Sequence, residues 1–206
     1  MCFLHFQSKT IHQKQNNMKT IEIIFYLVTV FWFINEIRNT KNLRRKEGDR
    51  KVKDSLNIYI IWIIFILGLS IPIIVSKTTN FQIAEGEWIM YSGFLLYIAG
   101  IALRIAVINY LGKYFTLDLT IKKDHKLITD GYYKLVRHPV YTAVLMTFLG
   151  FGLFLNNWIS LVFAFLPVTV ALIVRMKNEE AALIENFGDE YKNYQKKTKK
   201  LIPFIY

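Results

Sequence analysis

Long runs of apolar residues, separated by short polar or basic stretches, dominate the pattern of this chain. Because a helix rises about 1.5 Å per residue, about 20 apolar residues cross the roughly 30 Å hydrocarbon core of a bilayer. A soluble domain of 206 residues would not need apolar runs this long. The pattern therefore predicts an all-α fold, a polytopic membrane helical bundle of about five transmembrane helices. The expected spans are 18–37, 56–76, 87–110, 139–155 and 158–174.

The last two expected spans are separated only by Asn156 and Asn157. Two residues are enough for a turn between antiparallel helices, so this region predicts a tight helical hairpin. At the other end of the chain, the polar and irregular stretch before Met18 predicts a disordered tail or an upstream start. Three regions are expected: 1–17 as this tail, 18–98 as N-terminal transmembrane helices, and 99–206 as a core with the hairpin and a C-terminal helix.

Basic residues gather between the apolar runs and give a formal net charge of +11. They cluster in 38–53, in 111–137 and after residue 174, whereas the connection 77–87 carries few. Because cytosolic loops are enriched in Lys and Arg, five spans with the N-terminus outside would place all three basic segments, including the C-terminal helix, in the cytosol. This placement predicts contact with anionic membrane lipids rather than nucleic acid. One cysteine and four histidines without metal-site spacing predict neither an internal disulfide nor a bound metal.

The sequence RHPVY begins at residue 137, at the start of the fourth expected span. Pro139 suits the first turn of a helix, where its missing N–H is not needed, so His138 falls at the N-cap and Tyr141 lies on the same face. The amides at this helix end can receive an anionic group. Two interpretations follow: one wall of a binding site, or an interfacial anchor in which basic side chains meet lipid phosphates and tyrosines form an aromatic belt.

Charged residues also follow the fifth expected span, in RMKNEEAALIENFGDEYKNY. Arg175, Glu179 and Leu183 recur every four residues and share one face of a helix, which Gly188 is expected to end. An Arg–Glu pair at this spacing is common on solvated helix surfaces and worth little there, so a surface pair and a functional pair both remain open. Several apolar residues predict that this helix folds back on the bundle: Ala181, Leu183, Ile184 and Phe187.

Arg104 stands inside the third expected span, about six residues from its cytosolic end. Its long side chain can reach the interface from that depth. Charged residues within membrane spans also tend to line polar, functional cavities. Arg104 is therefore a candidate for substrate binding as well as a candidate for an interfacial side chain.

Taken together, three stretches resemble the isoprenylcysteine carboxyl methyltransferase family, which belongs to a wider set of membrane enzymes that includes phospholipid N-methyltransferases. The stretches are LGKYFTLDLTIKKDHKLITDGYYKLVRHPVYTAVLMTFLGFGLFLNN, then RMKNEEAALIENFGDEYKNY, and the ending LIPFIY. The resemblance covers about residues 100–206. His-Pro-x-Tyr alone is a weak motif, but its conjunction with Gly-x-Tyr, the two-Asn hairpin and the Arg-x-x-x-Glu-Glu stretch is specific.

The resemblance implies an enzyme, an S-adenosylmethionine-dependent methyltransferase whose cofactor pocket lies in the cytosolic half of the bundle and its C-terminal helix. Arg175 matches the arginine that the family places near the substrate carboxylate, so it is the catalytic and substrate-binding candidate. Val140 stands where relatives often have Ser, so a hydrogen bond from that side chain is absent. The positions that match the cofactor-binding residues are His125, Lys126, Leu127, Ile128, Tyr133, His138, Pro139, Val140, Tyr141 and Glu179.

The expected acceptor follows from its protonation. A carboxylate is already ionised at neutral pH and needs only orientation, which an arginine can supply with two hydrogen bonds. An ammonium group must first lose a proton to a base. Arg175 therefore favours the carboxylate of an isoprenylcysteine-like or other lipid-like substrate that enters from the membrane, although a phosphate would be held equally well.

Three alternatives remain open at this point. A phospholipid or amine N-methyltransferase would use the same cofactor. Membrane sterol-type reductases have a similar His-Pro-x-Tyr and Phe-Gly pattern but use NADPH, and the short hairpin and the Glu179-Glu180 pair favour the methyltransferase over them. A non-catalytic membrane scaffold would use the same residues for stability alone. The residues specify neither the membrane nor an oligomeric state.

Overall fold

The computed structural model describes residues 2–42, 50–51, 58–115, 120–121 and 126–203. The chain divides into two units, 1–42 and 43–206, and each is described by itself. The first unit is one helix, α1 (Cys2–Asn42). Its segment Lys19–Asn39 is long and apolar enough to cross a membrane. The helix already begins at Cys2, so it continues through the stretch for which the sequence predicts a disordered tail or an upstream start.

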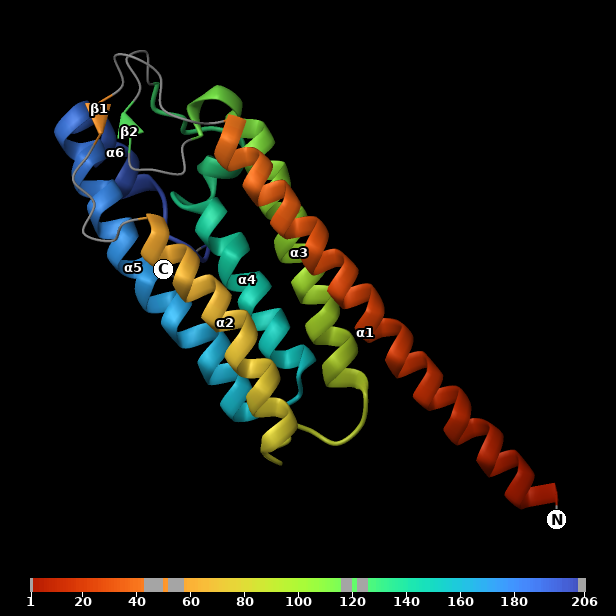
Figure 1. Ribbon diagram of the computed structural model, residues 1–206. Helices are drawn as coiled ribbons and strands as arrows, with labels where there is room; N and C mark the ends of the chain where they lie inside the picture. The colour runs from red at the N-terminus through yellow and green to blue at the C-terminus, as the bar shows by residue number, and fades with distance from the viewer. Residues whose placement is uncertain (1, 43–49, 52–57, 116–119, 122–125, 204–206) are drawn as a thin grey trace. The chain divides into compact units, whose positions relative to one another are not determined.

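The described part of the second unit is almost entirely helical, which confirms the predicted all-α class (Figure 1). Strands β1 (Arg50–Lys51) and β2 (Thr120–Ile121) form a short antiparallel pair. Two 3-10 turns, Gly112–Tyr114 and Gly131–Lys134, precede the fourth helix. The helices are α2 (Ile58–Thr78), α3 (Trp88–Leu111), α4 (Pro139–Phe154), α5 (Trp158–Phe187) and α6 (Asp189–Lys197).

Four helices in the described residues have the length and apolar character of membrane spans: the segment of α1 given above, α2, α3 and α5. The fifth expected span, α4, is a shorter apolar helix of 16 residues, about 24 Å long at the usual rise. Large apolar side chains face outward on these helices; Leu95 is 70% exposed and Ile63 is 55% exposed. Such faces suit lipid rather than water, and the chain is an integral membrane protein.

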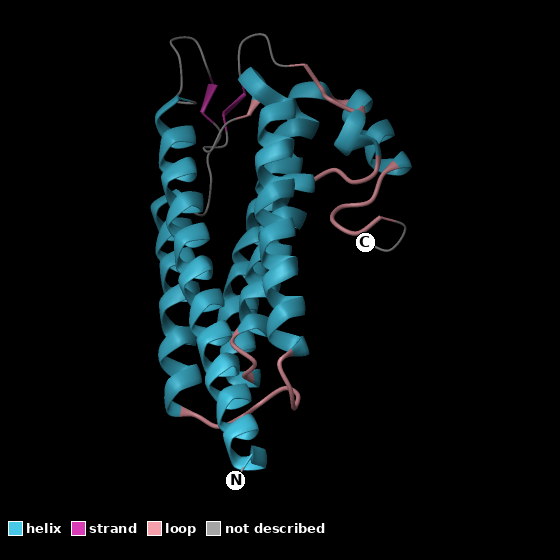
Figure 2. Ribbon diagram, turned by 90° about the vertical axis from the view of Figure 1, so that its right-hand side faces the viewer, coloured by secondary structure: helices cyan, strands magenta, loops and turns pink. Residues whose placement is uncertain are grey.

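The helices α3 and α4 lie antiparallel with their backbones in close contact. A Cβ atom added to Gly150 would lie 2.4 Å from the backbone nitrogen of Tyr97, and one added to Gly100 would lie 2.5 Å from the hydroxyl of Thr147. Only glycine permits such an approach. On its other side α4 contacts α5, and α2 packs along α5 (Figure 1). Figure 2 shows that most of the described chain is helical.

The predicted hairpin between α4 and α5 is present, and its two asparagines also hold the loop between α2 and α3. Asn156 has a positive φ of 47°, and its side-chain oxygen accepts hydrogen bonds from the amides of Ile83 and Ala84. Asn157 caps α5 by accepting from the amide of Ser160. These side-chain hydrogen bonds fix the end of the bundle that is opposite to RHPVY.

The helix α5 is 30 residues long, about 45 Å at the usual rise, and therefore longer than a bilayer core. The charged stretch 175–187 continues this helix without a break, so the expectation that it folds back on the bundle is wrong. Its buried face includes Met176 and Glu180, whereas Ala181 is exposed. Gly188 ends the helix as predicted, with a positive φ of 56°, and α6 follows directly.

Candidate active site

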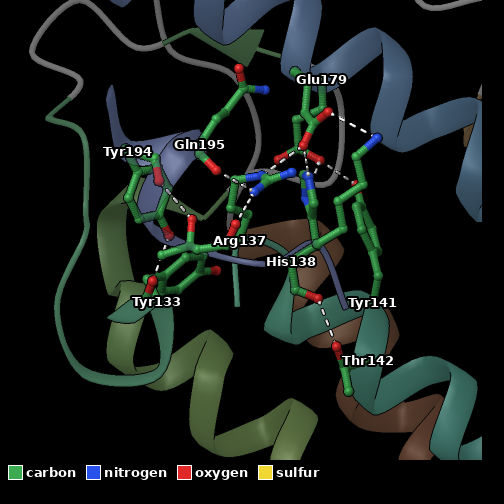
Figure 3. Close-up of polar contacts among 11 residues, drawn as sticks. Tyr133, Arg137, His138, Tyr141, Thr142, Glu179, Tyr194 and Gln195 are labelled. Carbon is green, nitrogen blue, oxygen red and sulfur yellow. Dashed lines mark hydrogen bonds and ion pairs between the residues drawn. The ribbon is translucent and has the colours of Figure 1, made fainter. Parts of the chain in front are cut away.

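The polar residues singled out in the sequence meet where α4 begins, beside the charged half of α5 and the segment that follows α6 (Figure 3). His138 is the N-cap of α4 and Pro139 is its first residue, as predicted. The amides of Arg137 and His138 donate to the carbonyls of Lys199 and Lys200, at 2.8 and 3.0 Å. The amide of His138, at the N-cap, is therefore engaged by the chain itself, and the prediction that this helix end offers free amides to an anion is wrong for this group.

Tyr141 lies between Arg175 and Glu179. Its hydroxyl donates to Glu179 Oε2 at 2.7 Å and accepts from Arg175 Nε at 2.9 Å. Arg175 is buried, while the side chain of Glu179 remains 32% exposed. The two charged residues are thus joined through the hydroxyl of the half-buried Tyr141 and do not form a solvated surface pair. We call these three residues the Glu179 triad.

His138 borders both glutamates of α5. Its Nδ1 lies 3.6 Å from Glu179 Oε2, and its Nε2 lies 3.3 Å from Glu180 Oε1. The imidazole stacks on the ring of Tyr141, with centroids 5.4 Å apart and planes 23° from parallel. Because both its nitrogens and its face are in contact, the ring of His138 is fixed between the two carboxylates.

Glu180 holds a second set of charges. Its Oε1 accepts from Arg137 Nε at 2.9 Å, and its Oε2 lies 3.2 Å from Lys200 Nζ. Glu180 is buried, at 8% relative exposure, so these cations offset the cost of removing its charge from water. We call Arg137, His138, Glu180 and Lys200 the Glu180 anchor.

Arg137 also fixes the end of the described chain. Its Nη1 donates to the backbone carbonyls of Gln195, at 3.1 Å, and of Thr198. The hydroxyl of Thr142 donates to the carbonyl of Leu201 at 2.8 Å. Sequence reasoning left Arg137 between an anchor and a site and did not identify the segment 198–201 as its partner, because bonds to backbone carbonyls leave no pattern in the side chains.

Tyr133 forms the other side of this region. It packs against an apolar cluster of Val107, Ile108, Phe115 and Val140. Burial raises the pKa of its hydroxyl, and the charge of Glu179 raises it further. Its backbone carbonyl accepts from the hydroxyl of Tyr194 at 2.6 Å, and burial raises the pKa of Tyr194 to about 12.

Other predicted residues are not members of the Glu179 triad or the Glu180 anchor as defined above. Lys126 is exposed, Leu127 and Ile128 are half-buried, and His125 lies outside the described residues. Val140 is buried in the apolar cluster, consistent with a position that contributes no side-chain hydrogen bond. Arg104 is buried on the face of α3 that packs against α4, between the levels of Gly100, which meets Ala143, and Val107, which meets Val140.

The residues that form this site lie largely within a region that matches a known protein family. Residues 93–185, a little under half of the chain, match the model of the "Isoprenylcysteine carboxyl methyltransferase (ICMT) family". This region is therefore similar to the isoprenylcysteine carboxyl methyltransferase family. The predicted resemblance is thereby confirmed. The family region contains the Glu179 triad and most of the Glu180 anchor, whereas Lys200 and the segment 198–201 lie beyond it.

Relatives that are similar to this region have names that agree with the family match. The chain is 37% identical over 105 residues to the protein-S-isoprenylcysteine O-methyltransferase of Schizosaccharomyces pombe, which is 50% of this chain and 44% of that protein. It is 33% identical over 126 residues to a probable protein-S-isoprenylcysteine O-methyltransferase of Oryza sativa subsp. indica, 60% of this chain and 66% of that protein. The chain thus spans less than two thirds of either relative.

A solved structure shares the fold. It is described as the eukaryotic intramembrane Ras methyltransferase ICMT without a monobody, and it aligns with a TM-score of 0.54 and 26% identity. The alignment covers 70% of this chain and 50% of that one. The helical arrangement around the family region is therefore similar to that of a membrane methyltransferase.

Proposed function

We propose that this chain is a multi-pass membrane enzyme, an S-adenosylmethionine-dependent methyltransferase. Its acceptor is the carboxylate of an isoprenylcysteine-like or other lipid-like substrate drawn from the membrane. The observation that carries the proposal is the Glu179 triad, which joins a buried arginine to a partly exposed carboxylate within a methyltransferase family region. The basic segments favour an active site on the cytosolic side.

The residues fit the proposed cofactor, which bears an ammonium group, ribose hydroxyls and an aromatic base. Of the two adjacent glutamates, Glu180 is buried among cations, whereas Glu179 is reachable from outside. Glu179 is thus the carboxylate that a cationic or hydroxyl-bearing ligand can contact. His138, Tyr133 and Tyr141 would complete the wall. The remaining cofactor positions implied by family resemblance are His125, Lys126, Leu127, Ile128, Pro139 and Val140.

When bound, S-adenosylmethionine supplies a methyl group on a positively charged sulfur. The chain's task is to align an acceptor oxygen with that methyl and to exclude water. An ionised carboxylate already carries the electron pair that would form the new O–C bond while the bond between the methyl group and sulfur breaks and the sulfur leaves as a neutral thioether, so no side chain has to remove a proton. Arg175 would orient the carboxylate through paired hydrogen bonds, and buried Arg104 is the second proposed substrate-binding residue.

The direct test uses the full chain in lipid nanodiscs, with labelled methyl donor and a synthetic S-farnesyl-cysteine whose amine is blocked. We expect an alkali-labile methyl ester, and S-adenosylmethionine binding measurable by calorimetry. Glu179→Ala should weaken that binding at least about tenfold, since a hydrogen bond to a charged group is worth about 1.5–3 kcal/mol. Glu190→Ala, at an exposed position of α6, is the matched control.

Three results would replace the proposal. An alkali-stable methylamine formed from an amine lipid would identify an N-methyltransferase. Tighter binding of NADPH than of S-adenosylmethionine would identify a reductase. Absence of binding to both would identify a scaffold, in which Arg175 and Tyr141 contribute only to stability.

A further inference from the structure

We propose that the hydroxyl of Tyr141 is a positioning group that orients Arg175 toward the acceptor carboxylate. It does so by tying the guanidinium to Glu179, the residue assigned to the cofactor. The inference rests on the proposed function and specifies how the cofactor wall and the acceptor arginine are connected. The connection is one hydroxyl, because Tyr141 Oη lies within hydrogen-bond distance of both charged groups.

The direction of these two bonds is fixed by their chemistry. An arginine can only donate and a carboxylate can only accept, whereas a phenol has one hydrogen to donate and lone pairs to accept. With its hydrogen directed to Glu179 at 2.7 Å, Tyr141 presents only lone pairs to Arg175 Nε at 2.9 Å. The order Arg175 to Tyr141 to Glu179 therefore has no reversed alternative.

The rest of Tyr141 is held independently of this hydroxyl. Its ring stacks on His138, and its backbone amide donates to the carbonyl of His138 at 3.0 Å. The hydroxyl is therefore placed by the start of α4, not by α5. Residues four apart on a helix are close enough to pair directly, and the phenol oxygen instead lies between Arg175 and Glu179.

This arrangement determines how Arg175 can meet an acceptor. Its Nε is committed to Tyr141, so a paired contact with a carboxylate uses the edge formed by its two terminal nitrogens. Without the hydroxyl, Arg175 is expected to turn toward Glu179 and form a direct ion pair. Loss of the hydroxyl should therefore weaken recognition of the acceptor's charge, while the aromatic ring that faces the cofactor remains.

The test measures charge recognition without any methyl transfer. The probes are S-farnesylthioacetic acid and its primary amide, which share a lipid chain and differ in the charge of the head group. Each competes with a fluorescent prenyl probe for the full chain in nanodiscs. We expect the wild-type chain to prefer the acid by about tenfold or more, and Tyr141→Phe to reduce the preference to at most about threefold, the effect of losing a bond that positions a charged group.

Further variants separate positioning from folding and from cofactor binding. Arg175→Gln, which removes the charge, should also remove the preference, and the double variant with Tyr141→Phe should be no worse than Arg175→Gln alone, because both changes break one interaction. Glu179→Gln keeps an oxygen that accepts a hydrogen bond from the hydroxyl, so it should preserve the preference for the acid while it weakens the binding of S-adenosylmethionine. Tyr194→Phe, which removes a buried hydroxyl bonded to a backbone carbonyl, should preserve both.

The outcomes distinguish this inference from the proposed function. A wild-type chain that forms the methyl ester and prefers the acid, with that preference intact in Tyr141→Phe, overturns the inference and leaves the function. An equal loss of acid and amide binding in Tyr141→Phe assigns the hydroxyl to stability and also overturns it. A wild-type chain that neither prefers the acid nor forms the ester overturns the proposed function itself.

Discussion

Glu179 and Glu180 are neighbours in the sequence and in α5, but their side chains have different surroundings. Glu180 is buried among Arg137, His138 and Lys200, and it connects α5 to the segment after α6. Glu179 keeps about a third of its side chain exposed and bonds to the Tyr141 hydroxyl. Successive residues on a helix point about 100° apart, so one turn of α5 presents one carboxylate to the interior and another to a partly exposed position.

The difference shows that two adjacent charged residues can have different roles, one in stability and one at an accessible position. A buried carboxylate surrounded by cations stabilises the fold because removing it leaves the cations unpaired. A carboxylate that stays accessible contributes less to stability and is available to a ligand. Two adjacent glutamates in the sequence carry no sign of this division, which depends on what each one faces.

The largest effect is expected from Glu180→Ala. It would leave the guanidinium of Arg137 buried without its carboxylate, and breaking a buried pair in this way costs about 3–5 kcal/mol. Thermal unfolding in detergent should show a much lower midpoint, whereas Glu179→Ala should change the free energy of unfolding by less than about 1 kcal/mol, as for exposed pairs. Equal destabilisation by the two variants would contradict the division, and Glu185→Ala, at an exposed position of the same helix, is the control.

An intermediate effect is expected from Arg137→Lys. The guanidinium bonds Glu180 through Nε and two backbone carbonyls through Nη1, and a lysine ammonium cannot reproduce that planar fork. The loss should be about 1–3 kcal/mol, with faster proteolysis of the segment after α6. Lys134→Ala, at an exposed position nearby, should leave the proteolysis rate unchanged, and unchanged proteolysis in Arg137→Lys would refute the role of Arg137 in holding that segment.

The smallest effect is expected at alkaline pH. Burial raises the pKa of Tyr194 from 10.0 to about 12, so the folded state keeps this proton at a pH at which the unfolded chain loses it. Stability from this group is therefore complete below pH 10 and decreases as pH rises from 10 toward 12. Unfolding midpoints measured across this window should decrease less steeply in Tyr194→Phe than in the wild-type chain, and identical slopes would exclude the contribution of Tyr194.

The sequence predicted the helix ends and the turn that depend on neighbouring residues alone. Pro139 and His138 begin α4 because proline suits the first turn of a helix, and Gly188 ends α5 because it adopts a positive φ. The hairpin at Asn156 and Asn157 followed from the length of the gap between two apolar runs. Each of these predictions depends on a few consecutive residues.

What the sequence could not predict depends on contacts between distant segments. The segment 198–201 runs beside the start of α4 through backbone hydrogen bonds, in which any residue type can accept and any except proline can donate. Its carbonyls accept hydrogen bonds from the amides of Arg137 and His138, and the amide of His138 belongs to the helix end that we expected to be free. The position of Tyr141 between Arg175 and Glu179 likewise required the packing of α4 on α5, although each residue alone had been singled out.

The contact between α3 and α4 also limits where a lipid chain can pass between the helices. Along this seam even a methyl group on Gly93 or Gly150 would lie 2.4 Å from a backbone atom of the opposite helix. A hydrocarbon chain is wider than that methyl group, so the seam is a closed wall to any lipid from the level of Gly93 to that of Gly100. The proposed prenyl tail therefore cannot pass between α3 and α4 at these levels on its way to Arg175.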